Sequence, residues 1–466
     1  MRKRSIWMAI CALFSALSIS FVAGCGGAGD ASVNDSTVGT GGSESVGGSS
    51  DSTDGVGDSS DSTGPSAGEE TPDDIPNEDA LSLIAPEGEV FPYIDEVKNY
   101  LQAGEGAKVG DYYRTVTTQA TGVQIKWKYS AEGARKFLVE YATKADYSDA
   151  ISVEAGASKR SVEVKNLYKA TKYYVRVSAL DKNGAVKHSA EGTFETTSLG
   201  PRFMYVDDVR NMRDLGGYET VSGKTLVQGI AYRSGALTPP PGSAHYSNEL
   251  SAEGKAYMSE VLGIKTEIDF RSESESGVLL ADGSVIPGAT LKYITLNGYG
   301  DTFQYAKQYR EFFSTLANPS NYPVIMHCTG GADRTGSVVY LLHTMLGVSE
   351  LECLQGYELT SFSTYGVRDT QDGSTYENYF TGFMQKLNTY AGATSQEKAE
   401  TWMREIGITQ AQIDSIKAIF YGEMEIGVSG EKSADKAPIL RATEKKTLSE
   451  TFSETMEGWT LQKKEN

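Results

Sequence analysis

The chain has 466 residues, which is room for about three domains of ordinary size. It contains 43 Lys and Arg residues against 62 Asp and Glu residues, so its formal net charge is -19. A non-specific nucleic-acid binder needs a basic surface, and this acidic balance argues against a nucleic-acid partner. Only four cysteines occur, which excludes a disulfide-rich secreted scaffold.

Residues 1–24 have the order of an export signal. Three basic residues at positions 2–4 precede an apolar stretch at 6–22, and small residues follow. The sequence Val22-Ala23-Gly24-Cys25 resembles the lipobox of bacterial lipoproteins, which implies cleavage before Cys25 and lipidation of its thiol. An uncleaved signal anchor is the alternative, because the stretch approaches the length of a membrane span. Both alternatives anchor the chain to a bacterial membrane with its folded domains outside the cytoplasm.

Residues 25–80 are predicted to form a disordered tether. From Gly26 onward the segment is rich in Gly, Ser, Thr, Asp and Glu and has no aromatic residue and no Lys or Arg. Such a composition cannot bury enough apolar surface to offset the entropy lost on ordering. A weak cation site at the Asp cluster of residues 51–61 is the alternative, although its spacing matches no calcium loop.

Residues 88–198 show the strand pattern of a β-sandwich. Short alternating runs recur between turn signals at 123–127, 137–141, 162–164, 173–179 and 193–195. The stretch 167–173 and the alternation after it resemble the E–F corner of fibronectin type III domains. The resemblance implies that Trp127 is the core tryptophan and Tyr173 the corner tyrosine. No catalytic constellation stands out, so the role of this module stays open among spacer, wall contact and substrate presentation.

The catalytic domain is expected at residues 201–425. A short apolar run at 323–326 enters the loop His327-Cys328-Thr329-Gly330-Gly331-Ala332-Asp333-Arg334-Thr335, and an amphipathic helix is predicted to leave it and to end at Gly347. A glycine-rich loop at a helix N-terminus binds oxyanions and favours the thiolate form of a cysteine. Cys328 and Arg334 would thus bring a nucleophile and a bidentate guanidinium to one phosphate group.

This spacing resembles the Cys-X5-Arg signature of cysteine-dependent protein tyrosine phosphatases. The fuller form, from His327 to Gly336, is similar to bacterial atypical enzymes that act on phosphotyrosine, phosphoserine or phosphothreonine, and phosphoinositides. Segments 211–218, 232–235 and 262–275 match further landmarks of that family in the expected order, which a rhodanese or arsenate-reductase loop does not explain. The resemblance implies a multidomain chain: a fibronectin type III-like β-sandwich, then an α/β phosphatase domain with a central sheet flanked by helices.

The resemblance also implies roles for the loop residues. Cys328 would attack phosphorus and form a phosphocysteine, while Arg334 and the loop N–H groups stabilise the equatorial oxygens. His327 is expected to orient the loop, with an ordinary core histidine as the alternative. Thr335 is expected to hydrogen-bond the sulfur or, alternatively, the N–H groups of the first helical turn. The substrate phosphate would lie against Thr329, Gly330, Gly331, Ala332, Asp333 and Arg334.

The general acid is open among three carboxyl groups. A tyrosyl or inositol leaving oxygen needs a proton, and a carboxyl within hydrogen-bond reach is the expected donor. The family resemblance implies Asp333, in the loop itself. Asp301, in a turn upstream of the cysteine, and Asp269 are the alternatives. The pairs Asp269–Arg271 and Arg213–Asp214 are expected to form structural ion pairs beneath the loop.

Three further features complete the expectations. Many relatives have Lys where this chain has Ala332, and the missing charge favours phosphotyrosine over polyphosphorylated inositides. Compensation by Lys224, Lys307 or Arg310 is the alternative. Cys353 is expected in the core, with a resolving thiol for Cys328 as the alternative. The four histidines are scattered, so neither a metal nor another cofactor is predicted. Helices are expected over 392–421, and 429–466 is expected to be a charged, flexible tail.

Together these features predict a phosphoric monoester hydrolase of the protein tyrosine phosphatase type, with a phosphorylated protein as substrate. A phosphoinositide or inositol polyphosphate phosphatase is the alternative enzyme. From another class, the chain could be a surface adhesin whose second domain binds a phosphorylated partner without turnover.

Overall fold

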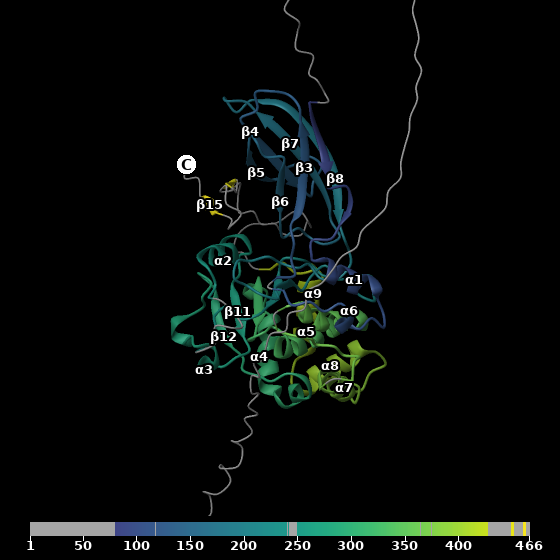
Figure 1. Ribbon diagram of the computed structural model, residues 1–466. Helices are drawn as coiled ribbons and strands as arrows, with labels where there is room; N and C mark the ends of the chain where they lie inside the picture. The colour runs from purple at the N-terminus through teal and green to yellow at the C-terminus, as the bar shows by residue number, and fades with distance from the viewer. Residues whose placement is uncertain are drawn as a thin grey trace, which may run out of the picture. The chain divides into compact units, whose positions relative to one another are not determined.

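The computed structural model describes residues 80–116, 118–239, 241, 249–363, 365–373, 375–426, 449–451 and 460–462. The predicted export signal, lipidated Cys25 and tether lie outside the described residues, as does most of the predicted tail at 429–466. Within the described ranges, no helix is both long enough and apolar enough to cross a membrane. A β-sandwich comes first along the chain and an α/β domain follows it (Figure 1).

Two sheets form the β-sandwich. The smaller sheet has the order β1-β3-β6, with β1 at Leu81–Ala85, β3 at Val123–Tyr129 and β6 at Ser161–Val164. The larger sheet has the order β15-β14-β5-β4-β7-β8-β2. Its strands are β2 (Gly88–Val90), β4 (Lys136–Ala142), β5 (Ile151–Gly156), β7 (Lys172–Leu180), β8 (Val186–Thr196), β14 (Ser449–Thr451) and β15 (Thr460–Gln462).

The predicted strand pattern is confirmed by burial. In β3, Val123, Ile125 and Trp127 are buried and alternate with exposed residues, as one face of a sandwich requires. The Trp127 ring packs against Phe137 with 5.2 Å between ring centroids. The N–H of Tyr168 donates to the Tyr173 hydroxyl at 2.8 Å, which is the backbone contact of a tyrosine corner.

A short helix interrupts the sandwich between β2 and β3. Helix α1 (Asp95–Ala103) and the 3-10 turn η1 (Val109–Asp111) were not predicted from the sequence. The buried side of α1 packs into a cluster with Leu359 and Phe362 of the α/β domain. In addition, Tyr100 donates to Glu358, and the N–H of Gly110 donates to Asp369 at 3.0 Å. This segment therefore packs against residues between 358 and 369 of the α/β domain.

A five-stranded sheet forms the centre of the α/β domain. Its order is β12 (Thr290–Tyr293), β11 (Thr266–Asp269), β13 (Val324–His327), β10 (Ala231–Ser234) and β9 (Arg213–Asp214). Only β9 runs antiparallel to its neighbour among the paired strands described. Val324 and Met326 face one apolar cluster and Ile325 faces another, so both faces of β13 are buried. The loop at Cys328 follows the carboxyl end of this central strand.

Helices surround this sheet (Figure 1). The α-helices are α2 (Ala252–Ala256), α3 (Glu273–Ser276), α4 (Ala306–Leu316), α5 (Asp333–Leu346), α6 (Glu350–Glu358), α7 (Thr375–Leu387), α8 (Ser395–Glu405) and α9 (Gln410–Phe420). The remaining short turns are the π-helix η2 (Tyr257–Val261) and the 3-10 turns η3 (Leu280–Asp282), η4 (Tyr299–Gln304), η5 (Pro319–Asn321) and η6 (Leu359–Phe362).

Helix α5 differs from the amphipathic helix that the sequence predicts. Every residue from Thr335 to Leu346 is buried, because α6 and α8 pack on it as well as the sheet. Its end is as predicted: Gly347 has φ 81°, a left-handed conformation that glycine adopts without strain. The loop is thus attached to a strand and a helix that are both enclosed in the core.

Candidate active site

Two glycines give the loop between β13 and α5 its shape. Gly331 has φ +64°, and a Cβ atom there would lie 2.2 Å from the carbonyl oxygen of Ser234. Gly330 faces the ring of Tyr365, which would lie 3.1 Å from a Cβ atom. Any side chain at Gly331 would therefore push the loop away from β10, and the tight curve after Cys328 depends on this close approach.

The carbonyl groups of the loop accept hydrogen bonds from residues outside the loop. The Thr329 carbonyl accepts from the N–H of Ala236 at 2.9 Å, the Gly330 carbonyl from Asn211 at 3.0 Å, and the Gly331 carbonyl from Arg233 at 2.5 Å. By contrast, the N–H groups of residues 329–332 donate to no acceptor in the described part of the chain. Unused N–H groups at the N-terminus of α5 form a receptor for an anion.

Arg334 and Cys328 complete this receptor. Cys328 is 3% exposed at the carboxyl end of β13. Arg334 lies in the first turn of α5, and its guanidinium donates to Glu275 at 2.8 and 2.5 Å. Burial disfavours the charge of Arg334, but Glu275 and Cys328 outweigh this effect and raise its pKa. The hydrogen bonds from Arg334 likewise lower the pKa of Glu275. The structure thus brings together the two residues with the firmest predicted roles.

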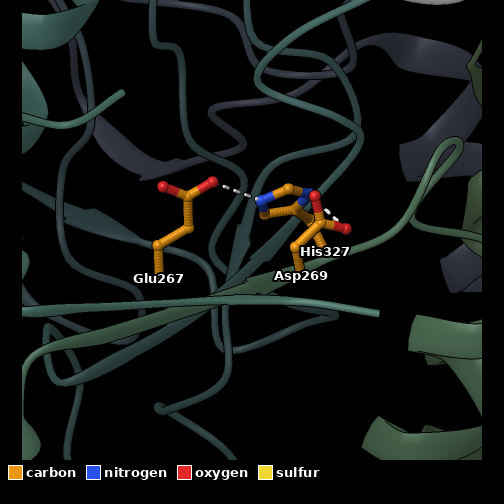
Figure 2. Close-up of side chains that lie close together, drawn as sticks. All are labelled: Glu267, Asp269 and His327. Atoms are coloured by element: carbon orange, nitrogen blue, oxygen red, sulfur yellow. Dashed lines mark hydrogen bonds and ion pairs between the residues drawn. The ribbon is translucent and has the colours of Figure 1, made fainter. Parts of the chain in front are cut away.

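His327 lies between two carboxylates (Figure 2). Its Nε2 is 2.9 Å from Glu267, and its Nδ1 is 3.8 Å from Asp269. These acids are two residues apart on β11, so their side chains leave the strand on the same face. Burial would raise the pKa of Asp269, but His327 and Arg271 outweigh it and lower that pKa. The contacts support the predicted orienting role, because they fix the imidazole ring at the residue before Cys328.

The same three side chains could offer donor atoms to a metal ion, since one atom from each lies within 4.8 Å of the others. The sequence prediction of no metal site did not anticipate this grouping. However, the carboxylate oxygens are already used: Glu267 accepts from Ser284 and His327, and Asp269 accepts from Arg271. We therefore assign these residues to loop support.

Asp333 is held at the N-terminal end of α5. Its Oδ1 accepts from the hydroxyl of Tyr299 and from Nε of Arg368, the latter at 2.8 Å. Tyr299 is also hydrogen-bonded to the hydroxyl of Tyr357 at 2.6 Å. Burial and the nearby Asp333 carboxylate raise the pKa of Tyr299, which keeps this phenol a hydrogen-bond donor. The predicted acid therefore has a defined position beside the loop.

The other two candidate acids have different surroundings. Asp301 is exposed in η4, where Asn297 and Gln304 donate to it at 3.4 and 3.2 Å. Asp269 is 1% exposed, and Arg271 binds both of its oxygens, as the predicted ion pair requires. Asp269 is too deeply buried for a leaving group to reach, whereas Asp301 is exposed and the Asp333 side chain, although paired with Arg368, is 38% exposed, so Asp333 and Asp301 are the two that fit.

The predicted ion pair between Arg213 and Asp214 is wrong. Consecutive residues of a strand point to opposite faces, and these two form β9. Asp214 pairs instead with Arg202 at 3.0 Å. Arg213 turns the other way and donates to Gly356, Asn211 and Thr360. It therefore supports the loop indirectly, through the same Asn211 amide that holds Gly330.

Thr335 and Cys353 are both buried. The Thr335 hydroxyl has no hydrogen-bond partner in the described structure, so its predicted bond to the sulfur stays a prediction. Cys353 is free, as is Cys328, and its thiol lies 3.9 Å from the Thr344 hydroxyl. Burial raises the pKa of the Cys353 thiol. These surroundings fit the expected core cysteine, and no disulfide joins it to Cys328.

Several site residues carry no local sequence signal. Glu275 stands four residues after Arg271 within a family landmark, but nothing in the spacing shows that it binds Arg334. Tyr365 and Arg368 come from the segment after η6, and Tyr299 comes from η4. Only the fold brings them to the loop.

Comparison with known families agrees with this geometry. Residues 204–422 match the model described as "Tyrosine phosphatase family", and residues 113–195 match that of the fibronectin type III domain. The α/β domain belongs to the tyrosine phosphatase family. The β-sandwich before this phosphatase domain is a fibronectin type III domain.

Individual proteins also resemble parts of the chain. The "Putative tyrosine-protein phosphatase" of Cupriavidus necator is 29% identical over 178 residues, and the match covers 32% of this chain and 60% of that protein. The core catalytic domain of the PP-IP phosphatase SIW14 from S. cerevisiae is 16% identical with a TM-score of 0.22, covering 38% of this chain and 83% of that one. A redesigned β-sandwich protein is 24% identical with a TM-score of 0.16, covering 18% and 85%.

Proposed function

We propose that this protein is a cysteine-dependent phosphatase that hydrolyses phosphomonoesters, with phosphotyrosine in proteins as its main substrate. One observation carries the proposal: the unused N–H groups of residues 329–332, Cys328 and Arg334 meet at the N-terminus of α5. This combination offers a nucleophile and donors for the three equatorial oxygens of a phosphoryl group. A site that only binds phosphate would not need a cysteine at its base.

The reaction takes two steps. In the first, the Cys328 thiolate attacks phosphorus, an S–P bond forms, and the bond from phosphorus to the leaving oxygen breaks. Asp333 gives a proton to that oxygen, so the product leaves as a neutral alcohol or phenol. In the second, water attacks the phosphocysteine and gives a proton to the Asp333 carboxylate, the S–P bond breaks, and inorganic phosphate forms as the thiolate is regenerated. Arg334 and the loop N–H groups stabilise the transferring phosphoryl group in both steps.

The charge near the loop favours a substrate with a single phosphate. Ala332 is buried and adds no charge where many relatives have lysine. Arg368 lies near this position, but its guanidinium is paired with Asp333 at 2.8 Å. The Tyr365 ring, which packs on Gly330, adds an aromatic surface beside the loop. The ring of a phosphotyrosine can pack against Tyr365. A polyphosphorylated inositol would find no added positive charge at Ala332 for its further phosphates.

We also propose that the protein is exported and anchored to a bacterial membrane through lipid on Cys25. The basic start, the apolar stretch and the lipobox-like sequence support this location. The tether between Cys25 and the folded domains would then let the phosphatase domain reach substrates outside the cytoplasm. Metabolic labelling with a radioactive fatty acid, compared between the wild-type chain and Cys25→Ala, tests the anchor. Equal labelling of both chains would contradict it.

Phosphate release tests the proposed activity. The full chain and its Cys328→Ser variant are assayed with a phosphotyrosine peptide, a phosphoserine peptide, phosphoinositides and inositol polyphosphates. We expect the phosphotyrosine peptide to be hydrolysed fastest and the variant to be inactive on every substrate. Faster release from inositol lipids would replace the substrate class but keep the mechanism. No release from any substrate, with the thiol reduced, would favour a phosphate-binding adhesin.

A further inference from the structure

A buried chain of hydrogen bonds runs from the fibronectin type III domain to the loop between β13 and α5. It begins at Gln119, which lies within the residues that match the fibronectin type III domain and is 1% exposed. The Nε2 of Gln119 donates to the Oδ1 of Asn211 at 3.2 Å and to the Leu359 carbonyl at 3.1 Å. Both acceptors belong to the α/β domain, so this side chain reaches from one domain into the other.

The main chain of Gln119 is fixed by the segment that contains α1. The N–H of Ile94 donates to the Gln119 carbonyl at 3.1 Å, and Ala120 pairs with Tyr93 in an isolated bridge. Tyr93 in turn belongs to the apolar cluster that α1 shares with Leu359. The Gln119 amide is therefore held in place by its own backbone as well as by its acceptors.

Asn211 connects Gln119 to the loop, and every hydrogen-bonding position of its amide is used. Its Oδ1 accepts from Gln119 and from Nη2 of Arg213, the latter at 2.9 Å. Its Nδ2 donates to the Gly330 carbonyl at 3.0 Å and to the Thr360 hydroxyl at 3.2 Å. An amide rotated by 180° would place its NH2 group against two donors and lose both acceptors. The donors on Oδ1 therefore decide which end of this amide faces the loop.

The Gly330 carbonyl decides where one N–H of the phosphate receptor points. The peptide bond between Gly330 and Gly331 is trans, so its carbonyl and its N–H point in opposite directions. Asn211 holds the carbonyl from outside the loop, which turns the N–H of Gly331 toward the receptor. Neither glycine has a Cβ atom to restrict rotation of this peptide. A donor outside the loop is therefore needed to keep the peptide in this orientation.

We propose that Gln119 is a positioning residue for the phosphate receptor. By holding the Asn211 amide, it keeps the N–H of Gly331 directed at the oxygens of a bound phosphoryl group. The fibronectin type III domain then belongs to the catalytic unit and is more than a spacer or a module for external contacts. This role rests on the proposed function, because the anion that the receptor binds is the phosphoryl group of the substrate.

Tungstate is the probe that tests this role, because it is a tetrahedral oxyanion and its binding needs no turnover. The full chain and its Gln119→Met variant are titrated with sodium tungstate by calorimetry, and kcat/KM for 4-nitrophenyl phosphate is measured on the same samples. We expect both the tungstate affinity and kcat/KM to fall about 3- to 10-fold in the variant, the usual effect of one hydrogen bond. Unchanged tungstate affinity would overturn the proposal. Gln119→Glu is the second variant, since its carboxylate cannot donate to Asn211, and it should lose at least as much affinity.

Two controls separate positioning from a general weakening of the domain contact. Gln124→Met makes the same chemical change at an exposed position of β3 and should bind tungstate as the wild type does. Asn166→Gly removes another contact between the domains, in which the Asn166 amide donates to the Tyr205 carbonyl at 2.8 Å and accepts from the Tyr205 N–H at 2.7 Å. It should lower the unfolding midpoint but leave the tungstate affinity unchanged. An equal loss of affinity in Asn166→Gly and Gln119→Met would show that the proposal is wrong.

A double substitution tests whether Gln119 acts through Asn211. Asn211→Gly keeps the left-handed backbone of this residue, whose φ is 57°, and removes its amide. In that chain, Gln119→Met should not lower the tungstate affinity further, because the connecting amide is already absent. Losses that multiply would overturn the proposal. A wild-type chain that binds tungstate but releases no phosphate would refute the proposed phosphatase activity, and the tungstate affinities would still decide the role of Gln119.

Discussion

Arg334 donates two hydrogen bonds to the carboxylate of Glu275, one to each oxygen, at 2.8 and 2.5 Å. The Thr329 hydroxyl donates to the same carboxylate at 3.1 Å. Glu275 is the third residue of the short helix α3, whose N-terminus is capped by the Ser272 side chain. A bidentate contact of this kind fixes the plane of the guanidinium. Arg334 is therefore oriented before a substrate arrives.

Replacing Glu275 should weaken catalysis without removing any group that touches phosphate. We expect Glu275→Gln to lower kcat/KM by about 10-fold or more, because a hydrogen bond to a charged group contributes about 1.5–3 kcal/mol. Steady-state kinetics on an aryl phosphate measure the change. Glu273→Gln, on the exposed side of the same helix, is the matched control and should retain wild-type kinetics. Equal activity of the two variants would show that Glu275 does not position Arg334.

The proton donor can be identified from the leaving group. We expect Asp333→Asn to slow the hydrolysis of phenyl phosphate by about 100-fold or more, the usual contribution of a general acid. With 4-nitrophenyl phosphate the loss should be much smaller, because that leaving oxygen needs little protonation. Asp301→Asn is the matched control, and any change that it causes in the rate should be equal for the two substrates. If Asp301→Asn shows the leaving-group dependence instead, Asp301 is the donor and the assignment of Asp333 is wrong.

Lys169 of the fibronectin type III domain is buried against the phosphatase domain. Its ammonium lies 4.5 Å from the centre of the Tyr218 ring, and its main chain exchanges hydrogen bonds of 2.9 and 3.0 Å with the Gln228 side chain. Burial lowers the pKa of Lys169 to about 8, from an ordinary value of 10.5. Between these two values the unfolded chain holds more protons than the folded chain. This group therefore makes folding more favourable as pH rises from 8 to 10.5.

We expect Lys169→Met to be more stable than the wild type at pH 7, by at most about 3 kcal/mol, because the cost of burying the charge is removed. The difference between the two proteins should shrink as pH rises above 8. Urea unfolding at several pH values measures both effects. Lys172→Met, at an exposed position of β7, is the control and should not change the pH dependence. A variant that is less stable at pH 7 would show that the contacts of Lys169 outweigh its burial.

Local patterns predicted the elements that frame the site. The run before Cys328, the glycines after it and Gly347 mark a strand, a turn and a helix end, because each signal lies within a few residues of its effect. The alternation of apolar residues along the strands of the sandwich is local in the same sense. So is the hydrogen bond from the Tyr168 N–H to the Tyr173 hydroxyl. These features needed no knowledge of the three-dimensional structure.

Long-range contacts could not be predicted in this way. Helix α1 is one short helix in a strand-rich segment, and its partners near Leu359 are far away in sequence. The carboxylate that binds Arg334 depends on where α3 packs. The hydrogen bonds that hold Asp333 come from Arg368 and Tyr299, which lie on separate segments. The error at Arg213 and Asp214 has another cause. Adjacent opposite charges suggest an ion pair, but a strand turns their side chains apart.

Trapping the intermediate tests the mechanism, because catalysis by Cys328 requires a phosphoryl group on its sulfur. The full chain is mixed with an excess of 4-nitrophenyl phosphate, quenched in acid within the first turnovers, digested and analysed by mass spectrometry. We expect the mass of one phosphoryl group on the peptide that contains Cys328, and none on that peptide from Cys328→Ser or on the peptide that contains Cys353. Turnover by the Cys328→Ser variant at the wild-type rate would contradict it.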